Sequence, residues 1–170
     1  MAEIDLAKHI ATIAPTISRQ QLRLAYHRPK QWAEPTRCFE NVDRKVSESG
    51  GGILFGWTFH HRFAEAIPGP GYLYVTHHAV WHEPPKGMLV DVTPYPDPKH
   101  RPLWPGGDTL FLLDDNARPI RSDKLIAPLL LRFFPLGDVP HLIAHVDRLN
   151  KDEQQRCREI YRGENLAARK

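Results

Sequence analysis

A sulfur nucleophile, a base and a carboxylate are the three side chains of a cysteine-type catalytic triad, and the chain offers a candidate for each in Cys38, His78 and Asp91. A thiol is a weak nucleophile until it loses its proton, and histidine, with an unperturbed pKa of about 6.5, can take that proton at neutral pH. A carboxylate beside the imidazole holds the ring in one tautomer and stabilises the imidazolium. Such a set attacks an acyl carbon and passes the acyl group to water or to an amine.

The histidine and the aspartate fall on two segments that the sequence predicts to be the arms of a β-hairpin. Residues 77–83 and 88–94 are rich in apolar side chains and flank a Pro-Pro-Lys-Gly turn at 84–87, which is typical of a hairpin. Successive side chains of a strand point to opposite faces. With the two central turn residues at the tip, Asp91 lies on the face of His78 and diagonal to it, at roughly 7–8 Å.

This alternation leaves the identity of the base open among three histidines. His82 lies on the same face as His78, and a turn longer by one residue would put His77 there instead. Each histidine can also be a structural residue with one satisfied ring nitrogen. Likewise, Asp91 followed by Thr93-Pro94 can simply end a strand in a turn.

The cysteine is predicted to open a helix. Thr36 is a suitable N-cap for a helix that continues to Ser47 and stops at the glycines that follow. Cys38 would then lie in the first turn, where unpaired N–H groups and the positive end of the helix dipole favour an anion. The alternative is a buried structural cysteine, since cysteine is among the most buried residue types. The stripe expected to fix the helix to a sheet consists of Phe39, Val42 and Val46.

Length and composition predict one α+β domain over residues 1–170, with a core at about 30–115 and a C-terminal helical segment at about 139–163. Early helices followed by sequential strands favour a mostly antiparallel sheet, on which the cysteine helix packs. The other expected elements are a helix at 3–14 that stops before Pro15, a strand or helix at 17–28, a strand at 53–59, a Pro/Gly-rich excursion at 94–108, a strand at 109–113, a mixed region at 120–136 and a helix or helix pair at 139–162.

Three short motifs surround the candidate residues: a cysteine that opens a helix, His-Ala-Val-Trp at 78–81 and Asp-Val-Thr-Pro at 91–94. In this order, over roughly residues 36–94, they resemble the papain-like cysteine-enzyme superfamily. Its transglutaminase-like and NlpC/P60-like branches look most similar. Transglutaminase-like domains also place a tryptophan just after the histidine and Thr-Pro after the aspartate.

That resemblance implies a papain-like fold in which Cys38 is the nucleophile, His78 the base and Asp91 the residue that orients it. It also implies thioester chemistry on a peptide or other amide-containing substrate, by an amidase, a peptidase or a transglutaminase-like enzyme. The tryptophan that follows the cysteine in the papain and transglutaminase motifs is absent, and Gln31 is only loosely spaced for the papain oxyanion donor. Substrate type and oxyanion stabilisation therefore stay open, with the backbone N–H of Cys38 as one candidate donor.

Three further residues are assigned to substrate binding: Asn41, Trp57 and Trp81. Both tryptophans have a core alternative, because large aromatic side chains are mostly buried for packing.

Charge, hydropathy and cysteine content argue against a nucleic-acid or membrane partner and favour a reducing compartment. The formal charge of +3 is mild, and no basic-aromatic motif indicates nucleic acid. No apolar run approaches a membrane span, and no charged-then-apolar N-terminal pattern indicates secretion. With two cysteines, Cys38 and Cys157, we expect a reduced, cytoplasmic protein without a disulfide framework and without a cofactor.

Two other classes of function remain. The chain has ten histidines, and five of them crowd into positions 60–82, so imidazoles with Asp91 could bind Zn²⁺ or Fe²⁺. Against this, no His-Glu-x-x-His or paired-cysteine spacing is present, and we assign no metal to the site. The remaining possibility is a binding or regulatory module that keeps the fold without the activity.

Overall fold

The computed structural model describes residues 5–95, 107–121 and 126–160. The chain divides into two compact units. The first comprises Met1–His60 and Val75–Leu129, and the second comprises His61–Tyr74 and Leu130–Lys170.

The elements follow one another as an α+β fold, which confirms that part of the fold prediction. In chain order they are α1 (Leu6–Ile17), β1 (Leu22–His27), α2 (Cys38–Ser49), β2 (Gly52–Arg62), β3 (Tyr72–Glu83), β4 (Met88–Asp91), β5 (Thr109–Leu113), β6 (Ile120–Arg121), β7 (Ile126–Ala127), β8 (Arg132–Pro135) and α3 (Pro140–Ile160). Residues 96–106, which hold most of the expected excursion, lie outside the described residues.

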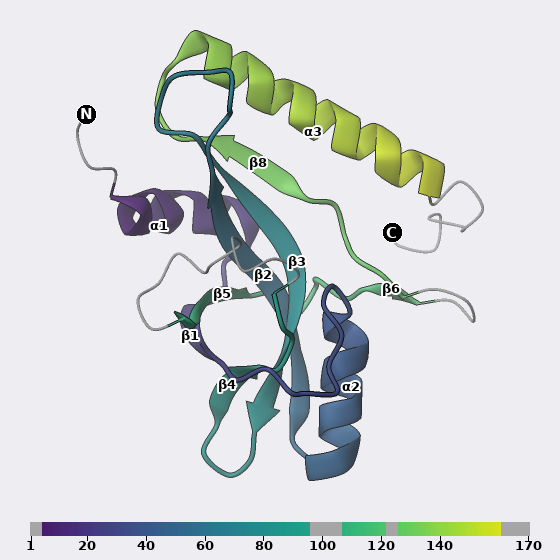
Figure 1. The fold of residues 1–170 in the computed structure, drawn as a ribbon. Helices are drawn as coiled ribbons and strands as arrows, with labels where there is room; N and C mark the ends of the chain where they lie inside the picture. Colours follow the sequence, from purple (N-terminus) through teal and green to yellow (C-terminus); the bar gives the residue numbers. More distant parts are fainter. Residues whose placement is uncertain (1–4, 96–106, 122–125, 161–170) are drawn as a thin grey trace. The chain divides into compact units, whose positions relative to one another are not determined.

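Five strands close into a mixed barrel. They are hydrogen-bonded in the order β2-β5-β1-β4-β3, and β2 also pairs with β3. Figure 1 shows these strands following one another around a ring. The pairs β1–β5, β2–β5 and β3–β4 are antiparallel, whereas β1 runs parallel to β4. Three of these four pairs are antiparallel, in agreement with the predicted mostly antiparallel sheet, whereas the closure into a barrel was not predicted.

The interior of the first unit is built from alternate residues of these strands. Ala25, Val80, Leu89 and Phe111 form a buried cluster, with Leu54 and Leu113 against it. Strand β2 is buried on both faces from Phe55 to Phe59, as the apolar run predicted.

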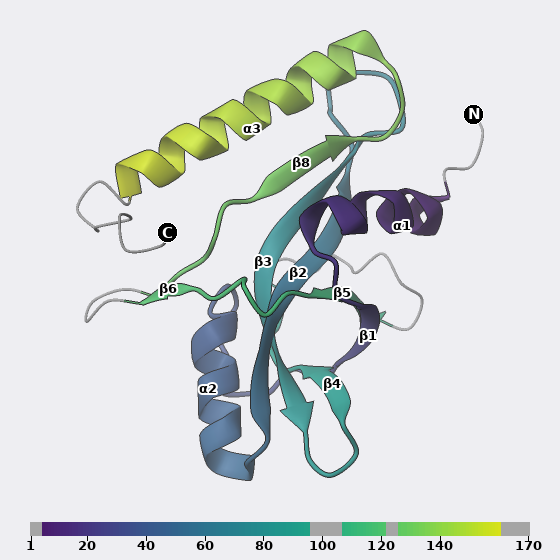
Figure 2. The same ribbon diagram turned by 180° about the vertical axis from the view of Figure 1, so that it is seen from behind.

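The cysteine-bearing helix α2 begins at Cys38 and ends at Ser49, and it runs beside β2 in both views (Figures 1 and 2). Phe39 and Val42 are buried, whereas Val46 is only partly so. The expected cap at Thr36 is wrong. Thr36 has φ +66° in the turn before the helix, and Arg37 occupies the cap position without a side-chain hydrogen bond.

Helix α1 continues through Pro15, which was expected to stop it. A proline removes one N–H donor from a helix. Here the last turn is closed by other groups, because Ser18 N donates to Ala14 O at 3.0 Å and Thr16 Oγ1 donates to Ile13 O at 2.7 Å. The start of the helix is capped by Asp5.

The hairpin prediction is confirmed together with its register. Trp81 lies opposite Val90 and Glu83 opposite Met88. The loop therefore consists of residues 84–87, with Pro85 and Lys86 at its tip.

In the second unit, β8 and α3 pack together in one apolar cluster. Tyr72, Leu142 and Val146 are buried there, with Phe133 against them. The C-terminal segment is one helix, α3, rather than a helix pair. Among the described residues, no helix is both long and apolar enough to cross a membrane.

We predict that Gly56→Ala destabilises the first unit. A Cβ at Gly56 would overlap the carbonyl oxygen of Leu112 on β5, where the two strands pair closely. The strain from such overpacking lowers the free energy of unfolding by about 1–3 kcal/mol. The matched control is Gly52→Ala in the same strand, because nothing lies within 4 Å of its added Cβ. Urea unfolding measures both, and equal stability of the two variants would contradict the prediction.

Candidate active site

The hairpin brings one histidine and one carboxylate together. His78 Nε2 donates to Asp91 Oδ2 at 2.9 Å, and the two side chains are 15% and 2% exposed. The register accounts for this contact, because Asp91 is diagonal to His78 on the same face of the β3–β4 pair. The sequence predicted this pair and its geometry.

Asp91 is fixed by its surroundings on both sides. Its second carboxylate oxygen, Oδ1, accepts from the Thr93 N–H at 3.0 Å. Its main chain lies opposite His27 of β1, and its carbonyl oxygen accepts from the Arg28 N–H at 2.8 Å. The aspartate therefore sits in a frame of two neighbouring strands with both carboxylate oxygens engaged.

Cys38 is the first residue of α2 and is buried, with 6% of its surface exposed. Its side chain interacts with the His78 imidazole, and this interaction raises the pKa of the ring. The first N–H groups of a helix have no partner within the helix, so the start of α2 presents donors beside this sulfur. The structure thus gathers Cys38, His78 and Asp91 in one place within the first unit.

The surroundings of His78 act on its charge in opposite directions. Burial lowers the pKa of the imidazole. The interactions of the ring with Asp91 and with Cys38 outweigh burial and raise the pKa of His78 well above its ordinary value. The site therefore favours the imidazolium form of His78 beside the Asp91 carboxylate.

The other two candidate histidines have different surroundings. His77 is buried on the opposite face, where its Nδ1 accepts from the Leu129 N–H at 2.8 Å and its Nε2 donates to the carbonyl of Ala117. Phe39 and Trp57 pack against its ring. His82 is exposed near the tip of the hairpin. Of the three, His78 is the one that hydrogen-bonds Asp91.

Asn41, one turn after Cys38 on α2, is buried and bonded to the protein itself. Its Oδ1 accepts from the Glu34 N–H at 3.1 Å. Its Nδ2 donates to the Glu34 carbonyl at 2.8 Å and to Thr93 Oγ1 at 3.2 Å. The expected role in substrate binding stays a prediction, and the contacts observed are structural ones.

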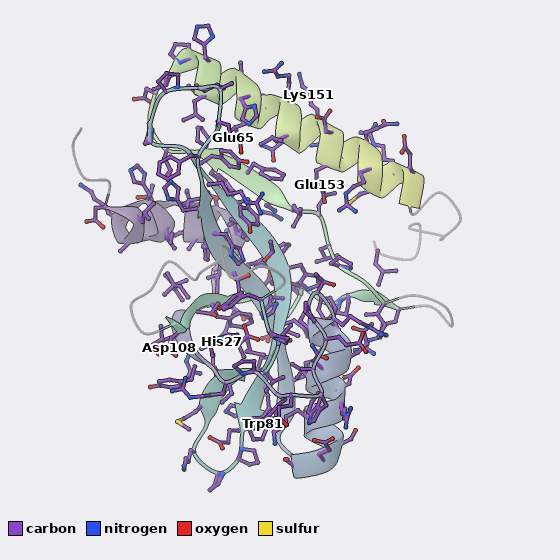
Figure 3. The ribbon with its side chains drawn as sticks, in the orientation of Figure 1. His27, Glu65, Trp81, Asp108, Lys151 and Glu153 are labelled. Carbon is purple, nitrogen blue, oxygen red and sulfur yellow. The ribbon has the colours of Figure 1, made fainter. Side chains whose placement is uncertain are left out.

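Both tryptophans assigned to substrate binding lie in the core. Trp57 is 2% exposed and its indole N–H donates to Asp114 Oδ2 at 2.9 Å. The indole N–H of Trp81 donates to the Gly50 carbonyl at 2.9 Å, which ties β3 to the end of α2. Figure 3 labels Trp81 on β3, His27 on β1 and Asp108 just before β5, where the Asp108 carboxylate accepts from the His27 N–H at 3.2 Å. A substrate role for either tryptophan stays a prediction.

The crowded histidines do not form a metal centre in the part of the chain that the structure describes. Within it, no three His, Cys, Asp or Glu side chains are placed to hold a metal ion. His60 instead contacts Thr58 and Thr76, and His61 contacts the carbonyl of Pro70.

Thr93 belongs to a motif noted in the sequence, but no role in the site was predicted for it. It contacts Asp91 through its N–H and Asn41 through its hydroxyl. The sequence did contain a signal for the Thr93–Asp91 contact, because an aspartate side chain often accepts from the N–H two residues later.

Comparison of the chain with protein-family models, curated proteins and solved structures gives no match.

The raised pKa of His78 predicts a pH dependence of stability. The charged imidazole contributes to the free energy of unfolding fully below about pH 6.5, the ordinary value, and that contribution is lost as the pH rises through the folded-state pKa. Asp91→Asn removes one anionic partner while burial remains. We therefore expect the titration midpoint of the His78 ring, followed by NMR, to fall in that variant.

The control for this titration is Asp115→Asn, which removes an exposed carboxylate that bonds Gln20. It should leave the His78 midpoint unchanged. A wild-type midpoint at or below about 6.5 would contradict the charge arrangement inferred for the site.

Proposed function

We propose that this protein is a cysteine-dependent acyl-transfer enzyme of papain-like type, in which Cys38, His78 and Asp91 form the catalytic triad. The observation that carries the proposal is the position of the His78 imidazole, which hydrogen-bonds the buried Asp91 carboxylate and also interacts with the Cys38 side chain. A helix that begins with cysteine, followed by strands that carry histidine and aspartate, also agrees with the papain-like resemblance of residues 36–94.

The two ring nitrogens of His78 have different roles in the proposed mechanism. A carboxylate only accepts hydrogen bonds, so Asp91 takes the Nε2–H of His78 and leaves Nδ1 as the ring nitrogen for the proton of Cys38. Nδ1 is then the atom that accepts the thiol proton of Cys38. The imidazolium formed in this step is stabilised by the same carboxylate.

The reaction proceeds through a thioester. The Cys38 sulfur attacks the acyl carbon, a carbon–sulfur bond forms, and the leaving group departs with the proton held on His78. Water, or an amine, then attacks the thioester and releases the acyl group, and the thiol is restored. The substrate is a peptide or another amide-containing molecule, and both hydrolysis and transfer use the same first step.

The oxyanion formed during attack needs donors near the sulfur. We assign this role to N–H groups at the start of α2, beginning with that of Cys38, since removal of one such donor typically costs about 3–4 kcal/mol of barrier. Gln31, the side chain considered from sequence, is exposed.

The two cysteines are equally buried, at 6% and 5% exposed, yet their neighbours differ. Cys38 contacts an imidazole. Burial and the adjacent Glu153 carboxylate raise the pKa of Cys157. Both are free thiols, a state that the reducing cytoplasm maintains, and we place the reaction there.

The first test is alkylation by iodoacetamide near neutral pH, read by peptide mass spectrometry. We expect Cys38 to react about tenfold faster than Cys157, or more, because the thiolate is the reacting form. His78→Ala should remove most of that advantage. His82→Ala is the control on the same strand, since His82 is exposed, and it should change nothing. Equal rates for the two cysteines in the wild type would overturn the proposal.

The second test uses p-nitrophenyl acetate as an activated acyl donor. We expect a burst of p-nitrophenolate of about one equivalent and an acetyl group on Cys38 in the intact mass. Asp91→Asn should slow the burst roughly 10²–10⁴-fold, the range of general base catalysis. Cys157→Ala should leave the burst unchanged and Cys38→Ala should abolish it. An unmodified Cys38 would favour the inactive binding module instead.

A further inference from the structure

The side chain of Asn41 links two parts of the site that are separate in sequence. Its Oδ1 accepts from the main-chain N–H of Glu34 and its Nδ2 donates to the main-chain carbonyl of Glu34, in the loop that leads into Cys38. Through Nδ2 it also reaches Thr93 Oγ1, just beyond the end of β4. The side-chain amide of Asn41 thus connects the loop before Cys38 to the segment that follows the strand of Asp91.

Thr93 continues this link to the carboxylate. Its N–H donates to Asp91 Oδ1 at 3.0 Å while its hydroxyl accepts from Asn41 at 3.2 Å. Asp91 in turn accepts from His78 Nε2, and His78 contacts Cys38. The contacts therefore form a closed circuit that starts and ends on α2.

Burial makes this circuit stiff. Asn41 and Thr93 are each 5% exposed and Asp91 is 1% exposed. A buried polar group that loses its hydrogen-bond partner is destabilised by the full desolvation free energy. Each hydrogen bond of the circuit therefore restrains the positions of the two groups that it joins. The rest of the loop is anchored to the same strand end, since the Lys30 N–H donates to the Val92 carbonyl at 3.1 Å.

We propose that Asn41 and Thr93 form a polar clasp that sets the position of the Cys38 helix relative to the His78–Asp91 pair, and so act as positioning residues of the triad. This inference rests on the proposed function. Neither side chain touches the reacting atoms. The clasp holds α2 at the distance at which sulfur and imidazole exchange a proton, and a displacement of about 1 Å at such a site can cost on the order of a hundredfold in rate.

The variant that isolates the clasp is Thr93→Val. Valine keeps the shape and the N–H that binds Asp91 Oδ1, and it removes only the hydroxyl that accepts from Asn41. Asn41 Nδ2 keeps its bond to the Glu34 carbonyl. Thr93→Ser restores a hydroxyl at the same position and serves as the rescue.

The matched control is Thr58→Val. Thr58 is 2% exposed and lies in the same unit, and its hydroxyl bonds Thr76 and His60, neither of which is in the circuit. The same chemical change is thus made at a similarly buried threonine. Thermal unfolding of both variants separates a loss of stability from a loss of positioning.

Two readouts decide the question in the intact chain. The first is the ratio of Cys38 to Cys157 alkylation rates within one molecule, which we expect to fall about tenfold or more in Thr93→Val, to recover in Thr93→Ser and to stay unchanged in Thr58→Val. The second is the NMR titration midpoint of His78, which should fall in Thr93→Val as the sulfur moves away from the ring. A purely structural threonine would move neither readout beyond the Thr58→Val control.

The outcomes separate the two proposals. A wild-type chain without preferential labelling of Cys38 overturns the triad and the clasp together. Preferential labelling in the wild type, with Thr93→Val indistinguishable from Thr58→Val in both readouts, overturns the clasp alone. A loss in Thr93→Val that Thr93→Ser restores establishes it.

Discussion

A carboxylate with almost no exposure to water is stable only where each of its oxygens finds a donor, and Asp91 meets that condition through two contacts. His78 Nε2 serves one oxygen and the Thr93 N–H serves the other. These contacts fix the end of β4 against β3, and the parallel neighbour β1 holds the same residues from the other side. The local arrangement of imidazole, carboxylate and the following turn depends on keeping this one buried charge compensated.

The barrel supplies the rigid frame for that charge. Because β2 pairs with both β5 and β3, the sheet closes and the strands that carry His78 and Asp91 are not at a free edge. Helix α2 is fixed to this frame by Phe39, whose ring lies 6.3 Å from that of Phe55, and by the Trp81 indole bonded to Gly50. The start and the end of the cysteine helix are therefore each tied to the sheet.

Similar residues acquire different chemistry from their neighbours. His77 and His78 are adjacent, yet one binds main-chain groups among aromatic rings and the other binds Asp91, because a strand turns successive side chains to opposite faces. The two cysteines contrast in the same way. Cys38 contacts an imidazole, whereas Cys157 lies beside Glu153, a carboxylate that disfavours a second negative charge.

Local rules in the sequence determined the hairpin, its tip at residues 84–87, the shared face of His78 and Asp91, and a helix near Cys38, because alternation and turn chemistry act between near neighbours. Contacts between distant segments decided the rest. The parallel β1–β4 pair, the barrel closure and the bonds of Asn41 to Thr93 join residues far apart in sequence, and no periodicity encodes such partners. Helix α2 begins at Cys38 as expected, and only its cap escaped prediction, because Thr36 adopts a positive φ set by its turn rather than the cap conformation that its residue type favours. The sequence thus favoured His78 as the partner of Asp91 and left His77 and His82 open, because the turn length sets the register, whereas the meeting of the His78 ring with the sulfur required the tertiary structure.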